Sequence, residues 1–187
     1  MSKPKYLRGF NNFGILPIVS DTATAYSVGE RVPIPGAVSC APTDNKTEYT
    51  IPADDGVWDS GSTWDSSTVV VTVTEAELEM LAQLTGATID KDVMEESTVD
   101  DATPVAINYA ALRRDGGYRM FSWLSAKLTG YKVSHNTRKE GAPEGQNYEL
   151  TFKCLGRKCD NKIRLTADTD ESISTTWLET IPAVPAV

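Results

Sequence analysis

The run TVVVTVT at residues 68–74 restricts the fold of this chain more than any other stretch. Its β-branched side chains lose rotamer freedom in a helix but pack well on a pleated sheet, so the run predicts a strand. Two more apolar runs, residues 105–112 and 118–124, flank Arg-Arg-Asp-Gly-Gly at residues 113–117. Asp-Gly-Gly readily adopts the positive φ values of a tight turn, so these runs are predicted to form a β-hairpin.

A third strand signal comes from alternation. Residues 148–154 read YELTFKC, with Tyr148, Leu150 and Phe152 on one face of the predicted strand. Side chains alternate between the two faces of a strand, so the opposite face is polar. That polar face consists of Glu149, Thr151 and Lys153. Residues 162–167 are predicted to form a final strand.

One helix is predicted, at about residues 75–85. Thr74 followed by Glu77 has the spacing of a capping box, and Gly86 suits the C-terminal stop. The apolar positions that recur at helical spacing are Leu78, Leu81 and Leu84. We expect this helix to pack on a sheet.

These elements predict a mainly β fold, a β-sandwich or partial barrel with one packed α-helix and long loops. A chain of 187 residues suits a single domain, residues 1–187. Segments rich in Asp, Ser, Thr, Gly and Pro are predicted as long loops, and both ends as extended arms. The loops are residues 41–67, 90–103 and 134–146, and the arms are residues 1–12 and 176–187.

The charge is acidic and unevenly distributed. The chain has 26 acidic and 18 Lys or Arg side chains, a net charge of −8, which argues against tight, static binding to nucleic acid. Residues 1–111 hold 17 acids and 6 bases, whereas residues 112–187 hold 9 acids and 12 bases. Copies of such a chain could attract one another head to tail, although solvated faces could give the same numbers.

The ends and cysteines bear on location. No stretch approaches the ~20 apolar residues that span a bilayer, and no membrane partner is expected. Asn11, Asn12 and Pro17 interrupt the weak apolar run near the start, which argues against a signal peptide. Three cysteines are too few for a secreted disulfide scaffold, so we expect synthesis in a reducing cytosol and free thiols at Cys154 and Cys159.

Catalytic and metal-binding patterns are weak. His135 is the single histidine and has no nucleophile motif nearby, so a solvated loop residue is favoured over a catalytic base. A zinc site of Cys40, His135, Cys154 and Cys159 has poor ligand spacing. Asp54 and Asp55, with Asp59 and Asp65, fit turns better than a calcium loop. We therefore expect no enzyme, no cofactor and no metal, with an enzyme centred on His135 as a rival hypothesis.

Aromatic side chains give the clearest binding signal. Tyr49, Trp58 and Trp64 lie in the hydrophilic segment 41–67, and Trp177 follows an acidic stretch near the C-terminus. Large aromatic residues in such segments often anchor subunit interfaces, although all four tryptophans could also belong to the core. We predict these four residues to contact neighbouring subunits. The alternative is a soluble β-sandwich module that binds a ligand or carbohydrate through Trp58 and Trp64.

The order of these features resembles a known family. The chain begins with a short basic lead and an extended segment that contains Pro-Gly-Ala-Val. A long Asp- and Tyr-containing loop, a β run and a short acidic helix follow. A hairpin and a Lys- and Glu-containing loop come next. The corresponding segments are residues 32–39, 41–67, 69–73, 75–84, 109–123, 136–144, 149–152 and 177–187. In this order the chain resembles the major tail protein, or tail tube protein, of long-tailed, siphovirus-type bacteriophages.

The resemblance implies a function as well as a fold. Subunits of this family close into hexameric rings that stack into the tail tube around the tape-measure protein, and the tube later conducts DNA during ejection. The implied location is the virion tail, assembled in the host bacterial cytoplasm, and the implied partners are further copies, the tape-measure protein, and tail terminator and distal tail proteins. DNA would pass through the lumen without specific binding. In such a tube we expect the polar strand face of Glu149, Thr151 and Lys153 to line the lumen.

Overall fold

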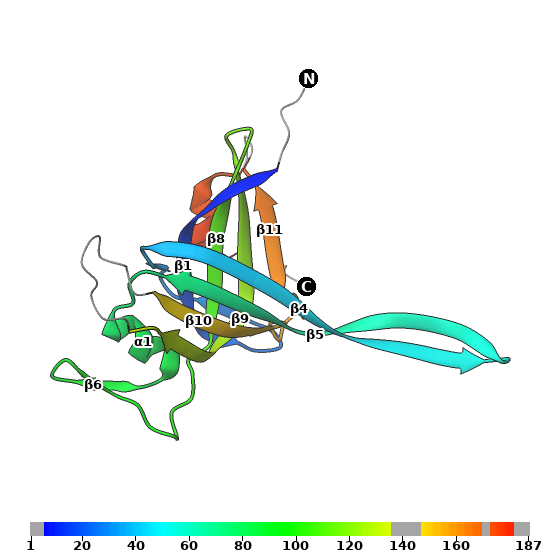
Figure 1. The fold of residues 1–187 in the computed structure, drawn as a ribbon, viewed down its shortest axis with the longest axis horizontal. Coiled ribbons are helices and arrows are strands. Elements are labelled where there is room, and N and C mark those ends of the chain that lie inside the picture. Colours follow the sequence, from blue (N-terminus) through cyan, green and yellow to red (C-terminus); the bar gives the residue numbers. More distant parts are fainter. Residues whose placement is uncertain (1–5, 136–146, 170–172, 182–187) are drawn as a thin grey trace.

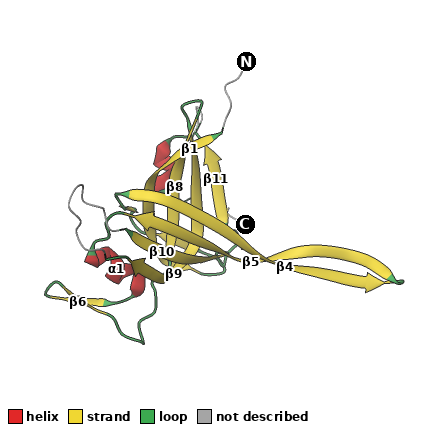
Figure 2. Ribbon diagram, viewed as in Figure 1, coloured by secondary structure: helices red, strands yellow, loops and turns green. Residues whose placement is uncertain are grey.

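The computed structural model describes residues 6–135, 147–169 and 173–181, and the chain is mainly β. Figure 2 shows strands throughout, with little helix. The strands are β1 (Leu7–Asp21), β2 (Tyr26–Val28), β3 (Val32–Pro33), β4 (Ala37–Ala53), β5 (Gly56–Val73), β6 (Thr88–Asp90), β7 (Val93–Glu95), β8 (Val105–Arg113), β9 (Tyr118–Val133), β10 (Tyr148–Leu155) and β11 (Arg164–Asp168). The helices are α1 (Leu78–Thr85) and the 3₁₀ helix η1 (Thr175–Glu179).

Nine strands form one antiparallel sheet that folds over on itself. The order is β2-β1-β8-β9-β10-β5-β4, with β3 paired to β1 and β11 paired to β9. Strand β9 belongs to both layers, because its first half pairs with β8 and β11 and its second half pairs with β10. In Figure 1 the strands β8, β9 and β11 run across the direction of β10, β5 and β4. The sheet is not closed, and the predicted mainly β fold, consistent with a β-sandwich, is confirmed.

The core lies between the two layers. Trp123, Ile15 and Phe152 are completely buried there, from β9, β1 and β10. On β10 the alternation is as predicted, since Leu150 and Phe152 point inward and Glu149 and Lys153 are exposed. Side chains of α1 close one end of this core. A smaller cluster on the other face of β8 and β9 is covered by η1.

The predicted hairpin at residues 113–117 is confirmed. Ala111 of β8 faces Arg119 of β9, and the turn places Gly116 at a φ of +97°. The Arg113 side chain folds back over this turn and forms ion pairs with Asp115 and Asp168. The buried Arg113 guanidinium therefore links the end of β8 to the turn and to β11.

The helix begins later than predicted. Its N-cap is Glu77, without a side-chain capping bond, and its first residue, Leu78, is 46 % exposed. Thr74 does not cap the helix, because both its backbone N–H and its hydroxyl donate to the Gly36 carbonyl and so continue the sheet. The buried face of α1 contains Met80, Leu81, Ala82 and Leu84. Gly86 ends the helix in the left-handed conformation, as predicted.

Two predicted loops are strands instead. Residues 41–67 belong to β4 and β5, and part of the acidic segment 90–103 forms the β6–β7 hairpin. The predicted loop 134–146 lies mostly outside the described residues. Of the predicted arms, residues 7–12 pair with β8 as part of β1, and η1 docks on the body.

All three cysteines are free thiols, as expected for Cys154 and Cys159. Burial raises the pKa of the Cys154 thiol to about 12 and that of Cys40 to about 11. No helix in the described ranges is long and apolar enough to cross a membrane. Over the same residues, no group of three or more His, Cys, Asp or Glu side chains is placed to hold a metal ion.

Replacing Gly86 with Ala tests the helix stop. Gly86 has a φ of +81°, and a Cβ there would overlap the Asp101 carbonyl oxygen. Gly116 has a similar positive φ, but a Cβ there meets nothing within 4 Å. Gly116→Ala should therefore lower the free energy of unfolding by only ~1 kcal/mol, the cost of an alanine in the left-handed conformation. Gly86→Ala should lower it clearly more, and urea unfolding measures both values. Equal losses would show that the helix end relaxes without cost.

Candidate functional site: the projecting ribbon

The most prominent feature of the surface is a two-stranded ribbon formed by residues 45–65, the outer parts of β4 and β5. It extends far beyond the body of the molecule (Figure 1). Its pairing runs from Lys46 opposite Trp64 to Ala53 opposite Gly56. Asp54 and Asp55, at φ values of 50° and 61°, form the two-residue turn at the tip. Two successive positive φ values are typical of a type I′ turn, which accounts for these residues better than the calcium alternative.

Both faces of the ribbon are exposed, and its outer half carries large apolar side chains. Trp58 is 72 % exposed, Val57 69 %, Ile51 49 % and Tyr49 45 %. An isolated two-stranded hairpin is marginally stable in water, and exposed apolar side chains gathered in one place mark an interaction site. The ribbon tip therefore has the features of a partner-binding surface.

The tip is also acidic. The ribbon holds five acidic side chains, Glu48, Asp54, Asp55, Asp59 and Asp65, against one base, Lys46. Near the middle, the Tyr49 ring lies over Gly61, where a Cβ would fall 2.6 Å from the Tyr49 hydroxyl. A glycine at position 61 thus lets the ring lie flat along the ribbon. The partner surface that fits this tip combines aromatic or apolar groups with positive charge.

Trp64 has a different role from Trp58, because it lies where the ribbon joins the body. Its indole N–H donates to the Ser66 carbonyl at 3.0 Å. The Lys46 Nζ lies 5.2 Å from the centroid of one of its rings, and the Arg164 guanidinium carbon 5.8 Å away. The same guanidinium lies 4.8 Å from the Trp123 ring in the core. We call Lys46, Trp64 and Arg164 the base clamp, since they connect the ribbon to the sandwich.

The two tryptophans lie at different places along the ribbon. Trp58 and Trp64 are six positions apart on an extended strand, a distance of about 20 Å. The alternative of a ligand-binding module uses both tryptophans. Tyr49, Ile51, Val57 and Trp58 are exposed on the part of the ribbon beyond Lys46, whereas Trp64 lies in the base clamp.

Trp177 packs on its own chain. It lies in η1 and contacts the small cluster of Ala110, Met120 and Leu178. The Asn108 amide donates to the Leu178 carbonyl, and the Arg31 guanidinium lies 3.5 Å from the Glu179 carboxylate. Sequence reasoning missed these two anchors, because each residue bonds to η1 across 70 or more positions of the chain.

The predicted lumen residues Glu149, Thr151 and Lys153 do share one open sheet face. Across β9, Lys132 lies opposite Glu149, and Lys127 lies opposite Lys153. The Lys127 ammonium is 2.8 Å from the exposed Asp101 carboxylate. The face thus holds three lysines and one glutamate on these strands, and is more basic than the strand 148–154 indicated by itself.

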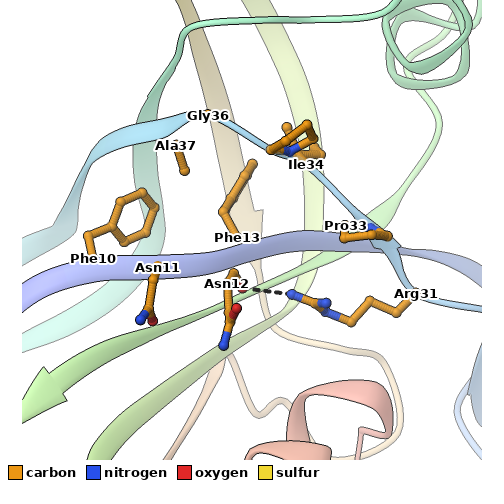
Figure 3. A pocket seen from close by; sticks show the side chains of 10 residues that line it. Phe10, Asn11, Asn12, Phe13, Arg31, Pro33, Ile34, Gly36 and Ala37 are labelled. Atoms are coloured by element: carbon orange, nitrogen blue, oxygen red, sulfur yellow. Dashed lines mark hydrogen bonds between the residues drawn. The ribbon is translucent and has the colours of Figure 1, made fainter.

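A cavity of about 500 Å³ lies beside β1. In Figure 3, Phe10, Phe13 and Ile34 lie on one side of the β1 ribbon and Asn11 and Asn12 on the other. Its cation, Arg31, is bonded to the Asn12 carbonyl, to Asn108 and to Glu179. The cavity therefore offers apolar walls and an arginine that already has partners.

No protein-family model matches this chain, and no curated protein matches it.

The different places of the two tryptophans lead to a prediction. Trp64→Ala removes the ring that holds Lys46 and Arg164, and should lower the free energy of unfolding by about 1–2 kcal/mol. Trp58→Ala changes a side chain that is 72 % exposed, and should stay within about 0.5 kcal/mol of wild type. Urea unfolding of the monomer measures both. A Trp58→Ala loss as large as that of Trp64→Ala would contradict the assignment of the base clamp.

Proposed function

We propose that this chain is the subunit of a bacteriophage tail tube: a structural virion protein, not an enzyme, that assembles as stacked hexameric rings. The tube would surround the tape-measure protein, end at terminator and distal tail proteins, and conduct DNA during ejection. The observation that carries the proposal is the ribbon, which extends beyond a β-sandwich and ends in exposed apolar side chains. The order of features along the sequence supports the same class of protein.

The ribbon favours self-assembly on physical grounds. Strands exposed on both faces bury almost no apolar area in the monomer. Ordering residues 45–65 therefore costs conformational entropy that apolar burial in the monomer does not offset. A contact that covers Trp58 and Val57 recovers that cost. A projecting element that fits a different surface on the next copy makes a heterologous contact, which generates rings or open tubes.

The body offers a second contact of the kind that closes rings. Within the described residues β4 ends the sheet and pairs only with β5, so the outer edge of its body segment has unpaired backbone groups. Exposed edges pair readily with strands of another chain. Joining of this edge to a neighbouring subunit would continue the sheet around a ring.

In this proposal the face of Glu149, Thr151 and Lys153 lines the lumen. The opposite face of the same strands is buried against the core, so this face is left for water. Opposite charges at Glu149 and Lys132, in directly paired positions, reduce the net attraction of the wall for phosphate. The tube is assembled in the host cytoplasm and remains in the virion tail.

Shortening the ribbon tests the proposal. Residues 48–62 are replaced by Asn-Gly, which keeps the Thr47–Thr63 pair and the whole base clamp. We expect the purified wild-type chain to form rings or tubes in negative-stain electron microscopy, and the shortened chain to remain a folded monomer. A wild-type chain that stays monomeric at high concentration would contradict the proposed function. Normal tubes from the shortened chain would contradict the role of the ribbon.

The lumen assignment has a separate test. Glu149→Cys in a Cys159→Ser background adds an exposed thiol to a chain whose other cysteines are Cys40 and the buried Cys154. A small maleimide should label position 149 in both monomers and tubes. A maleimide linked to a bulky polymer should label the monomer only, because the lumen excludes it. Equal labelling of tubes by the bulky reagent would place Glu149 on the outside.

A further inference from the structure

We propose that the ribbon tip of one copy docks on a patch formed by Tyr6, Arg8 and Arg114 of the next copy. We call these three residues the acceptor patch. The inference rests on the proposed function, since it names the surface that receives the ribbon. It is carried by the shape, charge and partners of the patch itself.

The three residues share one face at the end of β1. The Arg114 backbone N–H donates to the Tyr6 carbonyl, so Arg114 and Tyr6 are neighbours across the β1–β8 pair. Arg8 lies two residues beyond Tyr6 and is paired with Leu112. Residues two apart on a strand point to the same side. The Arg114 guanidinium donates to the Tyr6 hydroxyl at 2.6 Å and lies 5.5 Å from its ring centroid.

The patch is exposed, partly apolar and positively charged. Tyr6 is 53 % exposed, and its ring supplies the apolar part of the patch. Arg8 and Arg114 are exposed, and in the described part of the chain no carboxylate lies within ion-pair distance of either. Other arginines differ, since Arg113 and Arg119 pair with Asp168 and Arg157 pairs with Asp160. The two patch arginines thus keep their charges available for another molecule.

The ribbon tip has the complementary chemistry. Asp54, Asp55 and Asp59 flank the exposed Val57 and Trp58 along the chain. Arginine forms strong charge-assisted hydrogen bonds with carboxylates and also packs over tryptophan rings. Aromatic residues and arginine are the residues most enriched in protein interfaces. An acidic tip with a central tryptophan therefore fits two arginines beside a tyrosine.

The open sheet face is the main competing basic surface, and it fits less well. Lys132 and Lys153 lie there among Glu149 and threonines. Among these paired positions the large exposed apolar side chain is Leu155, which is aliphatic, whereas the acceptor patch has the Tyr6 ring. An exposed lysine also makes a weaker, less directional contact than arginine. The acceptor patch and the ribbon are also distinct surfaces, so their contact is heterologous and can repeat from copy to copy.

Charge reversal with rescue tests the proposal on the full-length chain. The first variant carries Arg8→Glu and Arg114→Glu, and the second carries Asp55→Arg and Asp59→Arg. Each should raise the protein concentration needed for assembly by about tenfold or more, because like charges then face each other. Combining all four changes should recover most of that loss. Sedimentation and electron microscopy measure assembly, and circular dichroism checks that each monomer is folded.

Lys158→Glu is the matched control, because Lys158 is also exposed but lies in the turn after β10, outside the patch. It should leave the assembly concentration unchanged within about twofold. The shortened-ribbon chain could lose assembly while both charge-reversal variants keep it. That result would overturn the acceptor patch and leave the proposed function intact. The acceptor patch would also be overturned if both double variants fold but assemble poorly and the variant with all four substitutions does not recover assembly. A wild-type chain that never assembles would instead contradict the proposed function.

Discussion

The rest of the structure depends on strand β9, which satisfies backbone hydrogen bonds in both layers at once. Its first half pairs with β8 and β11, and its second half with β10. Trp123 lies near the change of partner and is completely buried. Arg164 of β11 covers that ring and also faces Trp64 of the ribbon. One guanidinium therefore connects the centre of the sandwich to the base of its longest projection.

Sequence patterns revealed the parts of the fold that have one dry face. The alternation in β10, the turn at residues 113–117 and the glycine stop of α1 were all predicted, because burial and backbone sterics produce those patterns directly. The ribbon was missed for the same reason. Apolar side chains alternate along a strand when one of its faces is buried. Residues 45–65 bury neither face in the monomer, so their Asp, Ser and Thr content was interpreted as a loop.

The candidate site was predicted only in part. The aromatic residues of segment 41–67 drew attention to the segment that forms the ribbon. Their number did not reveal that Trp58 lies on the outer half of the ribbon and Trp64 in the clamp at its base. Trp177 was expected in an arm, whereas its contacts with the Ala110 and Met120 cluster come from strands far away in the sequence. Lys132 and Asn108 were missed because their importance arises from sheet register and from long-range hydrogen bonds.

The base clamp has a mechanical consequence. From the clamp to the turn the ribbon is about nine residues long, or roughly 30 Å. It acts as a lever, so each degree of rotation at Trp64 displaces the tip by about 0.5 Å at that length. Contacts between flat faces give no such amplification. In the proposed assembly, copies joined through such ribbons would curve by small rotations at every joint, and each tip would keep its contact with the next copy.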